Sequence, residues 1–248
     1  TAGYSNTQGE SREHTYADGV CSNCGEHKPP DNVGGYYQIT NQWQLRWFAD
    51  KVNKGETNIN AKLTQDITIN SNVLNSDGTL NTDANFTQWT PIGTESTPFT
   101  GTFDGKGHTI SGLYIDSNKD YVGLFGCVGE NGTATGTVKN VTLADSYVYG
   151  NSDVGGICGW NKCGTLQNCH NNGKVTGNFD VGGVCGQNHT NGTVEVCYNT
   201  GNVTGTNDCT GGVCGVNDGT LKNSYNPGDV SGRNFVGGVC GQNNGTVN

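Results

Sequence analysis

A six-residue phrase returns four times in the second half of the chain. It reads Val-Gly-Gly-x-Cys-Gly at residues 154–159, 181–186 and 236–241, and Thr-Gly-Gly-Val-Cys-Gly at 210–215. Its cysteines, Cys158, Cys185, Cys214 and Cys240, lie 27, 29 and 26 residues apart. A repeat of this length indicates a solenoid or a related array, whose function lies on a stacked surface rather than in one deep catalytic cleft.

Two further phrases complete each repeat. A Gly-Thr phrase occupies 164–169, 192–197 and 219–224, with a degenerate copy at 136–141, and a shorter phrase ending in Gly occupies 174–177, 202–205 and 229–232. Short β-branched runs between Gly and Asn are typical of strands joined by tight turns. Three strands per repeat predict an all-β fold, a right-handed parallel β-helix (β-solenoid) with repeats of 26–29 residues from about residue 120. The predicted inward ladders are Ile157, Val184, Val213 and Val239; Leu166, Val194, Leu221 and Val247; and Val175, Val203 and Val230.

The chain before the repeats contains one helical pattern. Within 36–55, Leu45, Phe48, Ala49 and Val52 follow the spacing of an amphipathic helix, with Thr40 or Asn41 as the N-cap and Gly55 as the stop. A helix at this place is expected to cap the open end of the solenoid core. We therefore expect a unit spanning 36–248, in which residues 71–98 form a long polar loop.

Composition excludes some classes of partner. The 248 residues carry a formal net charge of −9 with no cluster of Lys and Arg, which argues against nucleic acid. No apolar run is long enough to predict a membrane span. The sequence ends at Asn248 within a further repeat, so we expect the natural protein to continue. An open last coil would also allow self-association.

Eleven cysteines leave two interpretations open. The repeat cysteines fit buried thiol ladders, because free Cys is among the most buried residue types. Similar separations within successive repeats also allow at least one disulfide, although Ser224 replaces the expected cysteine in the third repeat. The candidates for disulfides are Cys158, Cys169, Cys185, Cys197, Cys209 and Cys214.

The polar leader, residues 1–35, contains a Cys-x-x-Cys pair between two histidines. The side chains of His14, Cys21, Cys24 and His27 could together hold a structural zinc ion in tetrahedral geometry. A local disulfide or two free thiols would explain the same pair. Asp153 and Asp180 share a column in the repeats, but we expect them to be solvated turn residues and calcium binding to be unlikely, because the calcium nonapeptide motif is missing.

Candidate ligand-binding residues are aromatic. His170, Tyr198 and Tyr225 occupy one column, and flat rings along a solenoid could stack on sugars or contact a protein. Trp160 is a further candidate, and ordinary packing between coils is the alternative for all four. The sequence has no His-Glu-x-x-His zinc-peptidase motif and no phosphate-binding loop, so no catalytic residue is predicted.

These phrases resemble a known family of repeats. The Val-Gly-Gly-x-Cys-Gly units, and especially residues 121–126 (Tyr-Val-Gly-Leu-Phe-Gly), resemble the GLUG motif of bacterial surface proteins. Residues 89–113 and 37–49 are similar to the segments that precede such repeats, so the resemblance covers about 36–248. It implies a non-catalytic, extracellular role at a bacterial surface or in a secreted protein, because the motif occurs in adhesins and in non-catalytic parts of immunoglobulin A metallopeptidases. In the leader, Arg12 stands where related modules have a cysteine.

We therefore expect a surface stalk or adhesin segment that binds a glycan or a host or surface protein, and not an enzyme. The alternative is an accessory scaffold of a larger secreted peptidase or polysaccharide-degrading enzyme. The sequence of the neighbouring domains would separate these two roles.

Overall fold

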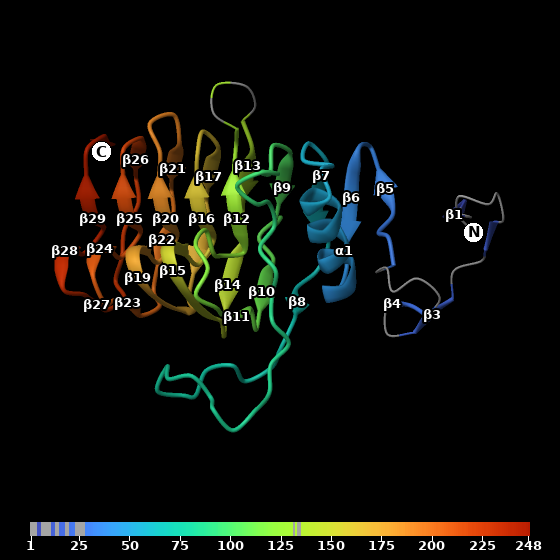
Figure 1. Ribbon diagram of the computed structural model, residues 1–248, viewed down its shortest axis with the longest axis horizontal. Coiled ribbons are helices and arrows are strands. Elements are labelled where there is room, and N and C mark those ends of the chain that lie inside the picture. Colours follow the sequence, from blue (N-terminus) through green and yellow to red (C-terminus); the bar gives the residue numbers. More distant parts are fainter. Residues whose placement is uncertain are drawn as a thin grey trace.

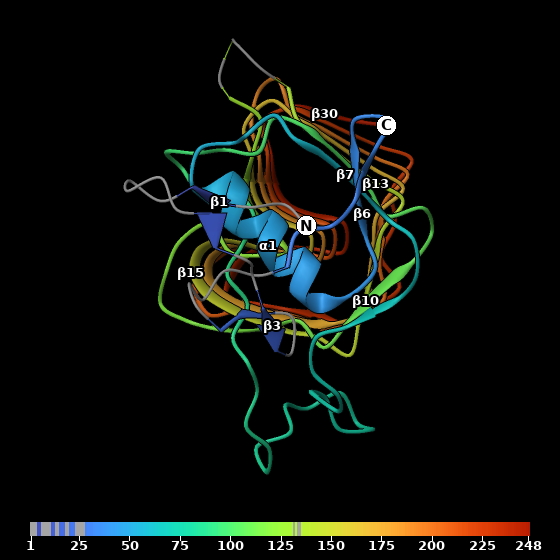
Figure 2. The same ribbon diagram turned by 90° about the vertical axis from the view of Figure 1, so that its right-hand side faces the viewer.

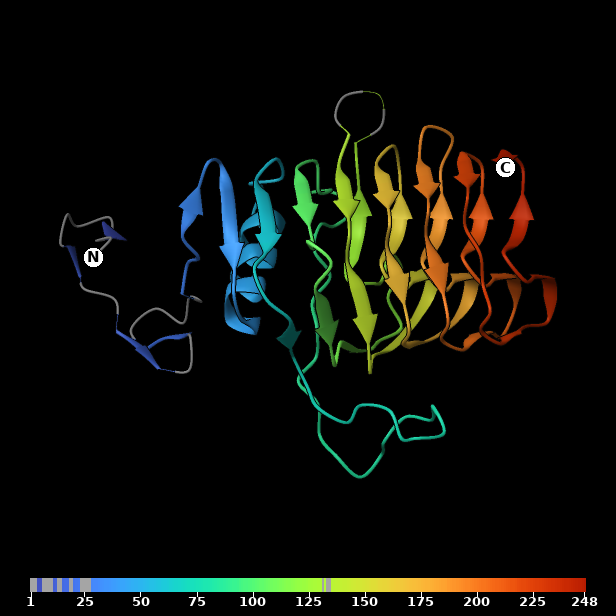
Figure 3. The same ribbon diagram turned by 180° about the vertical axis from the view of Figure 1, so that it is seen from behind.

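The computed structural model describes residues 4–5, 11–12, 15–17, 20–22, 28–130, 132 and 135–248. Parallel strands wind into successive coils that stack along the long axis, so the protein is a parallel β-solenoid (Figures 1 and 3). One helix lies at the N-terminal end of the stack. A long segment without regular helix or strand, residues 70–101, leaves the coils and returns to them (Figure 1). The predicted polar loop at 71–98 is thus present.

The coils build four sheets, here numbered I to IV. Sheet I contains β5 (Asn32–Val33), β6 (Tyr36–Ile39), β7 (Asn60–Leu63), β9 (Thr102–Asp104), β13 (Thr137–Lys139), β17 (Thr165–Gln167), β21 (Thr193–Glu195), β26 (Thr220–Lys222) and β30 (Thr246–Val247). Sheet II contains β8 (Ile67–Thr68), β10 (Thr109–Ser111), β14 (Thr142–Ala144), β18 (His170–Asn171) and β22 (Tyr198–Asn199).

Sheets III and IV complete each coil. Sheet III contains β11 (Tyr114–Asp116), β15 (Tyr147–Gly155), β19 (Lys174–Gly182), β23 (Val203–Gly205), β24 (Asp208–Gly211), β27 (Val230–Ser231) and β28 (Asn234–Gly237). Sheet IV contains β12 (Phe125–Val128), β16 (Cys158–Asn161), β20 (Cys185–Asn188), β25 (Cys214–Asn217) and β29 (Cys240–Asn243). Two small antiparallel ribbons precede them: β1 (Tyr4–Ser5) with β2 (Ser11–Arg12), and β3 (Tyr16–Ala17) with β4 (Val20–Cys21).

The expectation of three strands per coil is wrong. The coil that begins at Cys158 contains four strands, β16 to β19. The additional strand, β18, directly follows the Gly-Thr phrase at 164–169, because Asn168 adopts a left-handed backbone with φ of 50° and separates β17 from β18. Asn tolerates this conformation better than most residues, so the phrase supplies β17 and the corner that leads into β18.

The glycines of the repeated phrase are required by close backbone approach. A Cβ atom at Gly155, Gly182 or Gly211 would collide with the carbonyl oxygen of the cysteine three residues later. The chain therefore passes tightly over itself between sheets III and IV. This contact explains why a glycine recurs at this position in each coil.

The predicted apolar ladders form the core. Ile157, Val184 and Val213 are fully buried, and the ladder through Leu166, Val194 and Leu221 pairs in register between adjacent coils. Stacking of equivalent side chains buries apolar area that no single coil could bury alone. In the last coil, Val247 is 48 % exposed, because no further coil covers it.

Two buried asparagine ladders run beside the apolar ladders, and the sequence analysis missed them. In the first, each side-chain amide donates to the side-chain oxygen in the next coil at 2.7–2.8 Å, through Asn161, Asn188, Asn217 and Asn243. The second joins Asn171, Asn199 and Asn226 in the same way, at 2.8 Å. Each amide also bonds a nearby backbone carbonyl, so the buried polar groups are satisfied at the corners.

The helix α1 (Gln42–Asn53) covers the N-terminal end of the core (Figure 2). Asn41 is its N-cap, and its side-chain oxygen accepts hydrogen bonds from the backbone of Trp43 and Gln44. Phe48 packs against Phe99 and Phe103 of the first coils, with ring centroids 5.9 and 6.0 Å apart. The predicted capping helix is confirmed.

Candidate functional site

The returning loop forms a cleft against the first full coils. Its walls are residues 88–95 of the loop and 115–122 of the solenoid, and its volume is about 560 Å³. Trp89, Ile115 and Val122 provide buried apolar surface. We call this hollow the loop cleft. Concave sites with apolar walls and a few polar groups are the usual form of ligand sites.

The rim of the loop cleft is polar and mostly acidic. It carries the carboxylates of Glu95, Asp116 and Asp120, all of them exposed residues, and the amine of Lys119. Gln88 fastens the loop to the solenoid, because its side chain donates to the backbone oxygen of Asp116 and accepts from its backbone nitrogen at 3.1 Å. The arrangement favours ligands that offer hydroxyl donors and disfavours anions.

An aromatic stack supports one end of the loop cleft. The ring of Tyr121, which lines the cleft, lies on Trp160 with centroids 5.0 Å apart and planes at 19°. The amine of Lys162 lies 4.4 Å from the Trp160 ring and donates to the Glu95 carbonyl at 3.0 Å. Trp160 thus supports the cleft indirectly. Its ring packs against Tyr121 and against Lys162, which bonds the loop. Its own ring does not line the cleft.

The predicted column of His170, Tyr198 and Tyr225 is present on sheet II and just beyond it. The centroids of His170 and Tyr198 are 3.5 Å apart, and those of Tyr198 and Tyr225 are 5.0 Å apart at 16°. Neighbouring rings in this column therefore pack on each other, which covers part of the flat surface that a sugar would need. Tyr225 is the most exposed of the three, at 56 %.

A second column has an unusual backbone. Tyr121, Asp153, Asp180, Cys209 and Phe235 occupy equivalent positions in successive coils, and all have φ between 46° and 62°. The expectation that Asp153 is solvated is wrong, since it is only 8 % exposed between its column neighbours. Burial raises the pKa of Asp153 to about 7, and the Asp180 carboxylate adds to this effect. A hydrogen bond from the Ser152 hydroxyl, at 2.9 Å, opposes it.

The nine cysteines whose side chains the structure describes are free thiols. Cys158, Cys185, Cys214 and Cys240 pair in register across sheet IV, and Cys169 and Cys197 lie in another column, where the hydroxyl of Ser224 takes the place of the next thiol. The structure does not join Cys158 to Cys169, or Cys185 to Cys197. Burial raises the pKa of the Cys158, Cys185 and Cys214 thiols.

Buried thiols of raised pKa should react slowly. We expect iodoacetamide at pH 8 to leave Cys158, Cys185 and Cys214 unmodified in the folded protein, because the reactive thiolate is disfavoured and inaccessible. After unfolding without a reductant, mass spectrometry should find the nine cysteines with described side chains alkylated. Two unlabelled cysteines that become reactive only after reduction would instead reveal a disulfide between coils.

The predicted zinc ligands cannot be compared with the structure. His14, Cys24 and His27 lie outside the described residues, as does the side chain of Cys21. In the part of the chain that the structure describes, no three His, Cys, Asp or Glu side chains form a cluster suited to a metal ion. The zinc site stays a prediction.

Comparison with known proteins finds similarity to short parts of two other proteins. A segment of 79 residues is 52 % identical to halomucin of Haloquadratum walsbyi, which is 32 % of this chain and 1 % of halomucin. A segment of 61 residues is 39 % identical to a "Putative Gly-rich membrane protein" of Evansella cellulosilytica, which is 24 % of this chain and 7 % of that protein. The matches thus span a small fraction of both relatives. No protein-family model matches the chain.

The fold has a solved counterpart. The crystal structure of a "putative immunoglobulin A1 protease" from Bacteroides ovatus superposes with a TM-score of 0.62, over 90 % of this chain and 78 % of that one. The sequences are 20 % identical, so the likeness concerns the fold alone.

Among the described residues, no helix is long and apolar enough to cross a membrane.

Sequence reasoning did not find the loop cleft. Its two walls are some 25 residues apart along the chain, and no motif marks residues 88–95 as returning to 115–122. The one available signal was the left-handed position shared by Tyr121 and Asp153, which can be aligned from the repeated phrase. That alignment places an aromatic residue where the next two coils have Asp153 and Asp180.

Proposed function

We propose that this chain is a non-catalytic scaffold segment of a surface or secreted protein, and that its loop cleft binds a neutral glycan. The observation that carries the proposal is the pairing of the Tyr121 ring with exposed carboxylates in one concave site. The apolar face of a sugar ring packs on an aromatic ring, while its hydroxyls donate to carboxylate oxygens. The segmental similarity to halomucin and to a Gly-rich membrane protein supports a location outside the cell.

The rigidity of the site also supports this role. Tyr121 is held by Trp160 on one side and by a backbone hydrogen bond to Ser152 at 3.0 Å. Gln88 and Lys162 hold the loop wall. A preformed site loses little conformational entropy when a flexible sugar binds, so weak individual contacts suffice.

A glycan array followed by calorimetric titration tests this proposal. We expect a neutral glycan to bind the wild-type protein saturably. Its affinity for Tyr121→Asn should be at least about tenfold lower, because the variant loses the stacking ring. Asn is chosen because Tyr121 has a φ of 58°, which Asn tolerates. Tyr225→Ala is the matched control, since it removes an exposed ring outside the loop cleft. Loss of binding in Tyr225→Ala alone would assign the ligand to the column of His170, Tyr198 and Tyr225.

The second candidate function is an accessory scaffold within a larger secreted peptidase or polysaccharide-degrading enzyme. The fold similarity to the Bacteroides ovatus protein favours it. The adjoining coding sequence distinguishes the two roles, because a catalytic domain would support the accessory scaffold and a surface anchor would support the stalk or adhesin.

A further inference from the structure

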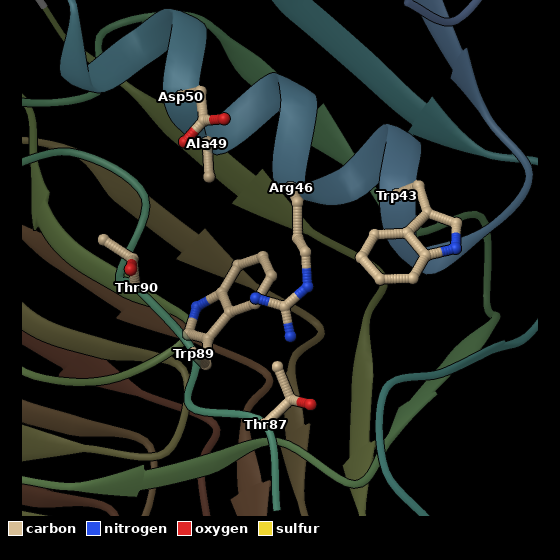
Figure 4. A pocket seen from close by; sticks show the side chains of 7 residues that line it. All are labelled: Trp43, Arg46, Ala49, Asp50, Thr87, Trp89 and Thr90. Carbon is tan, nitrogen blue, oxygen red and sulfur yellow. The ribbon is translucent and has the colours of Figure 1, made fainter. Parts of the chain in front are cut away.

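A second, smaller pocket lies between the capping helix and the returning loop. It is lined by Trp43, Arg46, Ala49 and Asp50 of α1 and by Thr87, Trp89 and Thr90, and its volume is about 250 Å³ (Figure 4). We call it the Arg46 pocket. Residues 87–90 separate it from the loop cleft, and the two hollows share Trp89 and Thr90 as lining.

The guanidinium group of Arg46 is only partly used within the protein. Its Nη1 donates to the backbone oxygen of Gln88 at 3.1 Å, and its Cζ atom lies 5.5 Å from the centre of the Trp89 ring. Its Nε and Nη2 atoms are buried and have no hydrogen-bond partner. Buried donors without partners are costly, so such a pair calls for an explanation.

The two unpartnered atoms are the pair that recognises carboxylates. Nε–H and the adjacent Nη2–H point in the same direction and form a flat fork, which matches the two oxygens of a carboxylate. Burial lowers the pKa of Arg46 and the Asp50 carboxylate opposes this effect, but arginine remains charged in proteins. The fork is therefore a fixed positive group in a site partly shielded from water.

The rest of the lining selects among carboxylates. Trp43 and Trp89 present aromatic surface on either side of the guanidinium (Figure 4). Asp50 adds one negative charge, which disfavours a phosphate or sulfate dianion and favours a ligand that also brings hydroxyl donors. A volume of about 250 Å³ holds one monosaccharide rather than a chain.

We propose that the Arg46 pocket binds the carboxylate of a single acidic sugar residue, such as a uronate or a sialate. The fork of Arg46 holds both carboxylate oxygens, the tryptophan rings pack against the sugar ring, and Asp50 and Thr87 face its hydroxyls. This site is separate from the neutral-glycan cleft and does not depend on it.

Tryptophan fluorescence and calorimetric titrations of the whole chain test the proposal, with methyl glucuronide and methyl N-acetylneuraminate as probes. We expect saturable binding of at least one of them and none of methyl glucoside. Arg46→Lys should weaken that binding at least about tenfold, because it keeps the charge but lacks the fork. Equal binding of acetate, or of a peptide carboxyl terminus, would overturn the assignment to a sugar.

A second substitution keeps the test decisive if Arg46→Lys unfolds the protein. Thr87→Glu places a carboxylate in the pocket beside an intact Arg46, so it should abolish binding of the acidic sugar without lowering the melting temperature. Thr87→Gln is its uncharged control and should retain binding. Tyr121→Asn should leave acidic-sugar binding unchanged, which separates failure here from failure of the loop cleft. Absence of any saturable response, or equal binding by wild type and Arg46→Lys, would overturn the proposal.

Discussion

Replacement of Asn188 by Ala is expected to lower the free energy of unfolding by about 3–5 kcal/mol. Asn188 is fully buried in the middle of the first asparagine ladder. Its amide donates to Asn217 at 2.8 Å and to two backbone carbonyls, and its oxygen accepts from Asn161 at 2.8 Å. Truncation leaves donors and acceptors in two adjacent coils buried without partners. The desolvation cost of each of these groups is then no longer offset by a hydrogen bond and lowers the free energy of unfolding.

Urea denaturation followed by circular dichroism measures this effect, and Asn243→Ala provides the matched control. Asn243 ends the same ladder and accepts from Asn217 at 2.7 Å, but it is exposed. Water can replace its bonds, so we expect a loss of only about 1 kcal/mol or less. Equal losses at the two positions would show that ladder burial does not determine the cost.

Substitution of Asp153 by Asn is expected to stabilise the protein above neutral pH. Burial raises the pKa of Asp153 from 3.8 to about 7, so the folded state holds this proton more tightly than the unfolded chain does. The contribution of Asp153 is thus fully favourable below about pH 4 and is lost as the pH rises through 7. The Asn side chain stays neutral and tolerates the φ of 53°. At pH 8 the variant should be more stable than wild type by up to about 4 kcal/mol, since one pKa unit corresponds to about 1.4 kcal/mol.

Melting temperatures of both proteins, measured from pH 4 to pH 9, test this prediction. The difference between variant and wild type should grow with pH and level off above pH 8. Asp83→Asn is the control, because Asp83 is exposed and is not among the groups that raise the pKa of Asp153, so its change should be small at every pH. A difference between Asp153→Asn and wild type that does not vary with pH would show that Asp153 is ionised in the folded protein throughout.

The repeated phrases predicted the solenoid because stacked coils need the same kinds of residue, apolar inside and glycine at close backbone contacts, at equivalent positions. The ladder of Ile157, Val184 and Val213 could be aligned directly from the Val-Gly-Gly-x-Cys-Gly units. The N-cap Asn41 and the apolar face of α1 were likewise local signals. Such features depend on spacing alone, so one sequence suffices to find them.

The features that prediction missed depend on contacts between distant segments or on burial. The burial of Asp153 follows from its neighbours in adjacent coils, and a local pattern of Asp beside Ser does not distinguish it from an exposed turn. The two pockets need the return of residues 87–95 to α1 and to β11, which no periodicity encodes. The first asparagine ladder did have a signal, since Cys-Gly-x-Asn recurs in four coils, but an asparagine in a glycine-rich phrase also fits a turn.

The stacking of coils along one axis has a mechanical consequence. The hydrogen bonds between coils run along that axis, so tension between the two ends loads the bonds of a terminal coil before those of the next. A coil occupies ~4.8 Å of axial length when stacked. Its 27 residues, counted from Cys158 to Cys185, reach ~90 Å when drawn out. Each coil that is released therefore lengthens nearly twentyfold, from ~4.8 Å to ~90 Å. A pulled solenoid gives way one coil at a time and so limits the force transmitted to whatever is attached at either end.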